Sequence, residues 1–319
     1  MISKKAFKRF INDYKLSIQP ICTEEYIERV FELIPDAKPQ FDLSLSEIGE
    51  DFATWMTAFE FSKNAMIEDI KNNNIYQEFI AFGGKEFEKR WELRNFPKGG
   101  IPNNTVFSRE NHNKAYLSVD LRQANFQALR KVGVYTCKSW KELVSKYTDS
   151  AHILNSKQFR EIIYGNLNIS RIASVEKYLT NEFRLGLEER SIIPENYRLV
   201  RFMPDELIYE IGENKLGFFE EKIKALSEDL GIEVKTQQFL LKSYYIQAKG
   251  DDRKIEFFGK LDLRSGNETI HCLGRPYYMI GLSLWKGAEK DDCMYDHMFL
   301  NQEGYLCTIN EEFEIKRGN

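Results

Sequence analysis

The sequence predicts an α+β protein with a helical N-terminal lobe, an antiparallel β-sheet with inserted helices, and a C-terminal α+β region. Three observations predict this class: helical spacing of apolar residues over 2–95, a break at 95–105, and β-prone runs after residue 231. Apolar residues make up 42% of the 319 residues, which is enough to build a sizeable core.

The N-terminal third is expected to be helical, with one long amphipathic stretch from Ser46 through Asp69. The run NFPKGGIPNNT at 95–105 contains two Pro, two Gly and three Asn, and it therefore marks a boundary. Beyond it, AYLSV at 115–119 predicts a strand that ends on Asp120 and leads into a helix stopped at Gly133.

A helical region and a β-hairpin are expected next. Helices are predicted over 139–148 and over 156–187, the second broken near Gly165-Asn166. The runs YRLVRF and LIYEIG then predict two strands joined by a tight turn that displays Asp205 and Glu206. A helix over 214–230 and several strands complete the chain, with a hairpin turn at 250–252.

Charge, cysteines and hydropathy limit the classes of protein that fit. The net charge is −4, yet the segment 114–171 holds ten Lys/Arg and four acids and is locally basic at +6. Five irregularly spaced cysteines suit reduced thiols better than a disulfide framework. No apolar run approaches the ~20 residues of a membrane span, and MISKKAFKRF lacks the apolar core of a signal peptide. We therefore expect a cytoplasmic protein without membrane contact.

The acidic residues at the ends of two predicted strands carry the functional prediction. Asp120 ends the first strand, and the pair Asp205-Glu206 lies 85 residues later on the hairpin. A palm-like sheet holds two divalent cations in this way, and two metals about 3.5–4 Å apart can activate a 3′-hydroxyl and neutralise a triphosphate. Each acid alone has a simpler reading: Asp120 as a helix N-cap, and the pair as a solvated turn.

Three stretches resemble motifs of family A DNA polymerases and occur in that family's order. VDLRQANF at 119–126 is similar to motif A, with Gln123 three residues past the Asp. MPDELIYE at 203–210 resembles motif C, with Pro204 in place of its His. SKQFREIIYG at 156–165 is similar to the fingers helix that closes over the incoming nucleotide.

The resemblance covers about 100 residues, from Ala115 to Ile211, and departs from the family at identifiable positions. The Lys-to-Tyr spacing of the fingers motif is one residue short, and Arg160-Glu161 replaces the Gly after Phe. The first motif also fits the reverse-transcriptase form Asp-x-x-x-Ala-x-Phe. The implication shared by both families is a palm.

The resemblance implies roles for eight residues. Asp120 and Asp205 would bind two Mg²⁺ or Mn²⁺ ions, and Glu206 would be a supporting catalytic carboxylate. The implied substrate-binding residues are Lys157 at the triphosphate, Arg160 as its substitute on the same helix, Tyr164 near the nascent base pair, and Gln123 and Asn125 after Asp120. Asn125 stands where the family places its sugar-discriminating Glu, which leaves the preference for dNTP or rNTP open.

Two hypotheses from different classes follow. The first is a compact template-directed nucleotidyltransferase that uses a primer-template and nucleoside triphosphates. Its expected domains are a thumb-like lobe at 1–105, a palm at 106–212 with a fingers-like insertion at 135–190, and a C-terminal region at 213–319 that completes the palm or grips template. The second is a catalytically silent palm relative, of the kind a virus could encode, that binds nucleic acid or an accessory protein.

Overall fold

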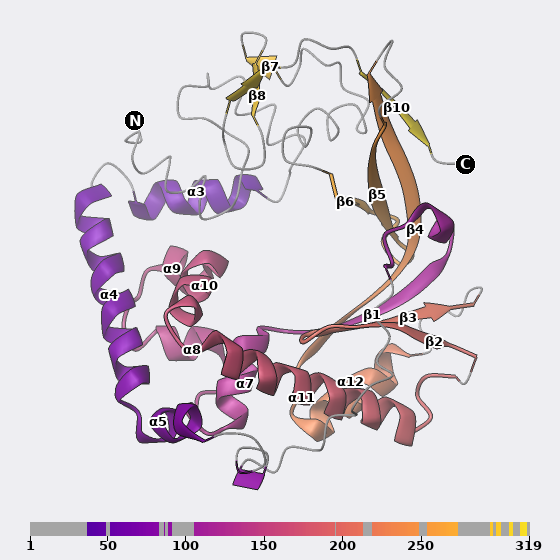
Figure 1. The fold of residues 1–319 in the computed structure, drawn as a ribbon. Coiled ribbons are helices and arrows are strands. Elements are labelled where there is room, and N and C mark those ends of the chain that lie inside the picture. The colour runs from indigo at the N-terminus through magenta and orange to yellow at the C-terminus, as the bar shows by residue number, and fades with distance from the viewer. Residues whose placement is uncertain are drawn as a thin grey trace.

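The computed structural model describes residues 37–48, 52–82, 86, 89–90, 105–194, 196–212, 219–248 and 254–273, and strand segments at 294–295, 298–300, 306–308 and 313–317. Figure 1 shows helices gathered on one side of these residues and an antiparallel sheet on the other, which confirms the predicted α+β class. The helices expected before residue 37 and the hairpin turn expected at 250–252 lie outside the described residues.

The described part of the N-terminal lobe consists of three helices: α3 (Ala37–Ile48), α4 (Phe52–Asn72) and α5 (Asn74–Ala81). The amphipathic stretch predicted over Ser46–Asp69 is helical but is divided between two helices, since α3 ends and α4 begins within it. Gly49 occurs between the two helices in the sequence, and glycine is a poor helix former. The Asn73 side chain caps α5 by accepting hydrogen bonds from two backbone amides.

The centre of the fold is a sheet in the order β2-β3-β1-β4-β5-β6, with every pairing antiparallel. Its first four strands are β1 (Ala115–Leu121), β2 (Arg198–Phe202), β3 (Glu206–Ile211) and β4 (Val234–Ala248). In the sheet, β1 lies between β3 and β4, which both follow it in the chain. Helices connect β1 to β2 and β3 to β4. This is a split βαβ arrangement.

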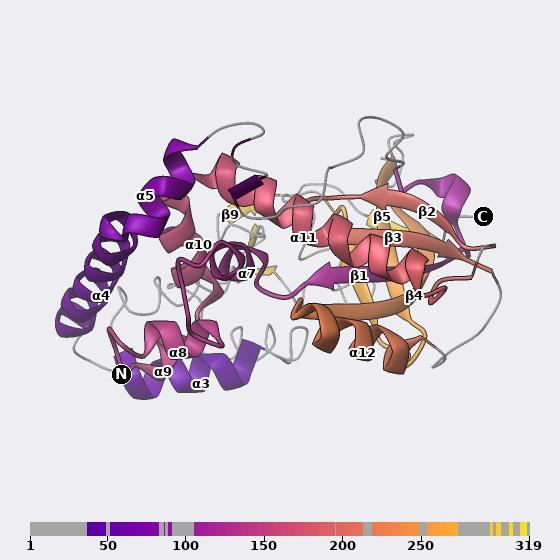
Figure 2. The same ribbon diagram turned by 90° about the horizontal axis from the view of Figure 1, so that it is seen from below.

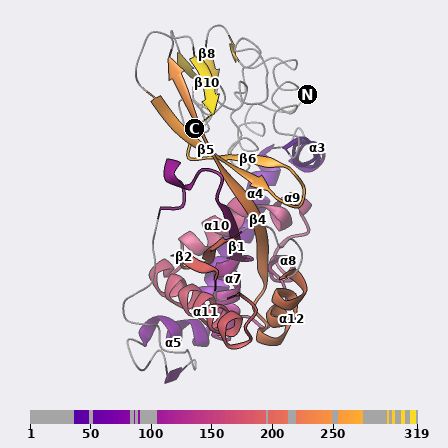
Figure 3. The same ribbon diagram turned by 90° about the vertical axis from the view of Figure 1, so that its right-hand side faces the viewer.

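The C-terminal region extends this sheet. The same sheet includes β5 (Lys254–Asp262), β6 (Glu268–His271) and β10 (Phe313–Arg317), and β10 pairs with β4. A second sheet is formed by β7 (Met294–Tyr295), β8 (Met298–Leu300) and β9 (Leu306–Thr308). The long strand β4 pairs with β1 over its first half and with β10 over its second half (Figure 3). The sheet therefore continues across the boundary expected at 212–213.

The helices between β1 and β4 occur in the predicted order, but some are shorter than predicted. They are α7 (Ala124–Lys131), α8 (Trp140–Val144), α9 (Ala151–Asn155), α10 (Lys157–Gly165), α11 (Ile169–Glu189) and α12 (Glu220–Leu230), and the short helix η1 (Arg109–Asn111) precedes β1. The predicted break near Gly165-Asn166 separates α10 from α11, which confirms it. The helix predicted over 139–148 is shorter, because α8 ends at Val144.

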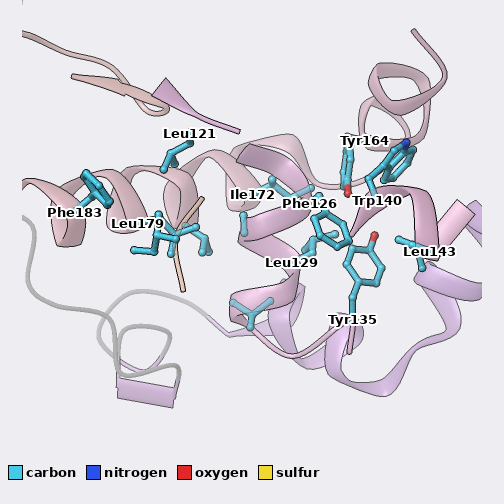
Figure 4. Close-up of a cluster of buried hydrophobic side chains, with 14 of the residues drawn as sticks. Leu121, Phe126, Leu129, Tyr135, Trp140, Leu143, Tyr164, Ile172, Leu179 and Phe183 are labelled. Atoms are coloured by element: carbon cyan, nitrogen blue, oxygen red, sulfur yellow. The ribbon is translucent and has the colours of Figure 1, made fainter. Parts of the chain in front are cut away.

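The main core lies between one face of the sheet and the helices α7, α11 and α12. Figure 2 shows α11 and α12 crossing the strands on this side, and Figure 4 shows the close packing of the side chains. The sheet contributes alternate residues, including Val119, Leu121 and Leu207, which belong to the same buried cluster as Phe126 and Phe183. Residues of the opposite parity, such as Ser118 and Asp120, therefore project from the other face of the sheet.

Candidate active site at the β1–β3 junction

The three acids predicted from sequence converge at the junction of β1 and β3. Asp120 is paired with Glu206 across the two antiparallel strands, and the Leu121 amide donates a 2.7 Å hydrogen bond to the Asp205 carbonyl oxygen. Residues 85 positions apart in the chain are thus neighbours at the same end of the β1–β3 pair. The acids are brought together by the pairing of β1 with β3, as the sequence predicts.

The turn that carries Asp205 is held in place by backbone and side-chain contacts. The Met203 amide donates to the Glu206 carbonyl oxygen at 2.7 Å, which closes the turn around Pro204. From α11, the Thr180 hydroxyl donates to the Pro204 carbonyl oxygen at 2.6 Å. Because both contacts fix the backbone on either side of Asp205, its position relative to β1 is set by the fold.

Hydrogen bonding orients Glu206, whereas Asp205 is exposed. The Ser118 hydroxyl donates to Glu206 Oε1 at 2.6 Å, which directs this carboxylate along the face of the sheet opposite to the core. Asp205 is exposed to solvent, and Asp120 is half-buried between them. The arrangement leaves an exposed, a half-buried and a hydrogen-bonded carboxylate side by side.

The proximity of these acids changes the protonation of Asp120. Burial, and then the negative charges of Asp205 and Glu206, raise the pKa of Asp120 from 3.8 to about 6, against the opposing attraction of Lys235 and Lys260. Within the described residues, none of the three carboxylates has an ion-pair partner within 4.0 Å. Among the described residues, Lys235 and Lys260 therefore act on Asp120 at longer range, and neither forms an ion pair with the three carboxylates.

A fourth carboxylate, Glu176, extends the group from α11 and was not found from the sequence. Its side chain is 7% exposed, and the Asn125 side-chain amide donates to its Oε1 at 2.5 Å. Burial, followed by the charge of Asp205, raises the pKa of Glu176 from 4.5 to about 7. The available signal was a Glu set among the buried positions of an amphipathic helix, next to Val175.

The predicted substrate-binding residues of α10 lie apart from the acids or within the core. Lys157 is exposed and forms an ion pair with Glu161 at 3.7 Å. Arg160 is partly buried, and this burial lowers its pKa. Tyr164 is 3% exposed, and its ring lies beside Trp140 with 5.6 Å between centroids (Figure 4). Stacking of Tyr164 on a base would require α10 to move.

The two remaining predicted residues lie between β1 and α7, close to the acids in the chain. Gln123 is exposed and adopts a left-handed conformation with φ of 50° at the N-terminus of α7. Asn125 is occupied by its hydrogen bond to Glu176. The structure therefore brings Asn125 into the acidic group through α11, and leaves the Gln123 side chain free to reach solvent.

The carboxylate oxygens of this site fit Mg²⁺ or Mn²⁺ if water and substrate phosphates complete the coordination of the ion. Among the residues that the structure describes, no group of three or more His, Cys, Asp or Glu side chains is arranged to enclose a metal ion. Mg²⁺, however, is commonly held by one or two carboxylates together with water and substrate phosphates. Asp120 and Asp205 supply such oxygens, and their mutual repulsion would be relieved by a bound cation.

Comparisons with known proteins add no relative: no family model matches the chain, and neither a curated protein nor a solved structure gives a match. Among the described helices, none combines the length and apolar character needed to cross a bilayer.

Proposed function

We propose that this protein is a compact template-directed nucleotidyltransferase that adds nucleotides to a 3′-hydroxyl. The observation that supports the proposal most is that Asp120, near the end of β1, meets Asp205, in the turn before β3, beside Glu206. None of the three has an ion-pair partner among the described residues. Bound Mg²⁺ or Mn²⁺ would supply the Lewis acidity and charge neutralisation that phosphoryl transfer needs.

In this proposal the residues of the chain bind and position. Asp120 and Asp205 hold the metal ions, and Glu206, fixed by Ser118, supports the primer end of the site. At neutral pH Asp120 is mostly ionised, because its pKa of about 6 lies below 7. A fall in pH through 6 would protonate Asp120 and weaken its ability to hold a cation.

Nucleoside triphosphates and a primer-template are the proposed substrates. Lys157 and Arg160 would meet the triphosphate and Tyr164 the nascent base pair after a movement of α10, while Gln123 and Asn125 would lie near the sugar. The basic character of 114–171, which contains α7 through α10, supports an acidic polymer as partner. We also propose a cytoplasmic location, in keeping with the free thiols of Cys137 and Cys272.

The test is primer extension with Mg²⁺ or Mn²⁺, comparing wild type with Asp205→Asn. Asp205→Asn keeps the size of the side chain and removes its charge, so we expect extension to fall by about 100-fold or more. Asp149→Asn, which changes an exposed Asp outside the acidic group, is the matched control and should extend as wild type does. Equal synthesis by wild type and Asp205→Asn would refute the proposal.

A second candidate function is a catalytically silent palm relative that binds nucleic acid or assembles with a protein partner. The observation that favours it is the burial of Tyr164, together with the lack of a group of three metal ligands among the described residues. It predicts that wild type binds a primer-template but synthesises nothing with either metal, and that Asp205→Asn binds equally well.

A further inference from the structure

We propose that Lys260 is a phosphate-binding residue of this site. This inference deepens the proposed function and rests on it, but it concerns a residue of β5 outside the motifs that the sequence singled out. The ligand chemistry is a phosphate group, and its two possible sources are the triphosphate of an incoming nucleotide and the backbone of the bound strand.

The register of the sheet places Lys260 on the same face as the acids. Tyr116 of β1 is opposite Phe239 of β4, which in turn is opposite Asp262 of β5. Lys260 is two residues from Asp262, and Asp120 is four residues from Tyr116, so both side chains project from one face. Burial lowers the pKa of Lys260, and the negative charges of Glu206 and Asp120 on this face oppose that shift.

The surroundings of the Lys260 ammonium group are aromatic on two sides. Its Nζ lies 4.6 Å from the centroid of the Phe239 ring and 5.5 Å from that of the Phe107 ring. The ring of His271 stacks on Phe107 with 5.5 Å between centroids. Burial, and then the charge of Lys260, lower the pKa of this imidazole to about 4, so it is neutral at pH 7. These rings position the ammonium group without neutralising it.

Lys260 is left with unused hydrogen-bonding capacity. An ammonium group has three donors, and Nζ makes no ion pair within 4.0 Å and no hydrogen bond in the part of the chain that the structure describes. The side chain is largely buried, and burial lowers its pKa. Since burying a charge without a partner is costly, the present compensation comes from longer-range attraction by Asp120 and Glu206.

Metal binding at the acids would remove that compensation. A divalent cation held by Asp120 and Asp205 would repel the Lys260 ammonium group, unless an anion entered the site with it. A phosphate group supplies this anion, and its oxygens accept from all three donors of Lys260. Two further cations lie on the same face of the sheet. Lys235 is opposite Asp120 in the β1–β4 register, and the charge of Arg201 contributes to the lowered pKa of Lys260.

Lys157, which the sequence reasoning assigned to the triphosphate, is a weaker candidate in this structure. It is highly exposed, and Glu161 one turn later on α10 already neutralises it at 3.7 Å. Lys260 has the opposite properties: it is sheltered from solvent, unpaired among the described residues, and held on the same rigid sheet as the acids.

The experiment measures binding, so it does not depend on catalysis. Wild type, Lys260→Met and Lys260→Arg are titrated with inorganic triphosphate by calorimetry, and with a fluorescent primer-template duplex by anisotropy, both in Mg²⁺. Lys242→Met is the matched control, because Lys242 is on β4 but faces the other side of the sheet. Thermal unfolding checks that each variant is folded.

We expect Lys260→Met to weaken one of the two probes by about 10-fold and Lys260→Arg to retain most of the affinity. Loss for triphosphate identifies the nucleotide as the source, and loss for the duplex identifies the strand. Unchanged affinity for both probes overturns the proposal. These affinities are measured separately from synthesis. A wild-type protein that extends no primer would refute the proposed function, and the affinities of the Lys260 variants would still test the role of Lys260 in phosphate binding.

Lysine methylation of wild type, mapped by mass spectrometry, gives a second measurement if Lys260→Met does not fold. Bound triphosphate or duplex should protect Lys260 and leave the methylation of Lys242 unchanged. Absence of protection at Lys260 by either probe would contradict the proposal.

Discussion

Glu176 is a buried carboxylate whose charge should destabilise the folded protein at neutral pH, and Glu176→Gln tests this. The substitution removes the negative charge that Asp205 repels, and it keeps an oxygen that can accept the hydrogen bond from Asn125. We therefore expect Glu176→Gln to be more stable than wild type above pH 4.5, with the full difference reached above pH 7.

The magnitude follows from the change in pKa on folding. The pKa of Glu176 rises from 4.5 to about 7, and each pKa unit is worth ~1.4 kcal/mol, so the ionised form costs the fold about 3 kcal/mol. Below pH 4.5 the carboxyl is protonated in both the folded and unfolded states, so it contributes nothing there. Between pH 4.5 and 7 only the unfolded state loses the proton, and wild type therefore becomes steadily less stable relative to the variant.

The assay is urea unfolding of both proteins in EDTA at pH 5 and pH 8. The variant should gain about 3 kcal/mol at pH 8 and about 1 kcal/mol at pH 5. Glu182→Gln is the matched control on the same helix, where loss of a surface ion pair with Lys131 should change stability by less than ~1 kcal/mol. A Glu176→Gln protein no more stable than wild type at pH 8 would refute the burial of an ionised Glu176 beside Asp205.

Two further substitutions test the site and the core. Asp120→Asn should abolish primer extension and yet raise the free energy of unfolding at pH 8 by ~1 kcal/mol, once solvent screening of this half-buried group is allowed for. A lower free energy of unfolding would contradict the partial burial of a charged Asp120 beside Asp205 and Glu206. Gly186→Val should lower the free energy of unfolding in urea by about 1–3 kcal/mol, because a Cβ atom there would lie 2.7 Å from Leu226 Cδ1 between α11 and α12. An unchanged urea midpoint would show that this contact relaxes freely.

The sequence was most informative where local patterns decide the structure. The β2–β3 hairpin and the break between α10 and α11 were predicted correctly, because Pro204 and Gly165-Asn166 interrupt regular structure for local steric reasons. The break between α3 and α4 was missed, since a single Gly49 within an amphipathic pattern is a weaker signal. The order of the strands in the sheet depends on pairings between residues far apart in the chain, which no local pattern reports.

The same limit applies to the candidate site. Asp120, Asp205 and Glu206 were predicted from strand ends and a turn, and the pairing of β1 with β3 brings them together. Glu176 and Lys260 were missed, because each approaches the acids from an element with no distinguishing motif. Their burial and partners are consequences of tertiary packing and can be recognised only once α11 and β5 are placed.

The long strand β4 has a consequence for dissecting this molecule. Its first residues lie opposite Asp120, and its last residues pair with Lys254 of β5 and Phe313 of β10. Truncation after Ala248 would strip β4 of both outer neighbours and expose the unpaired amides and carbonyls of a fifteen-residue strand. Such a fragment should aggregate edge to edge, so the residues on either side of Ala248 are best studied as a single piece.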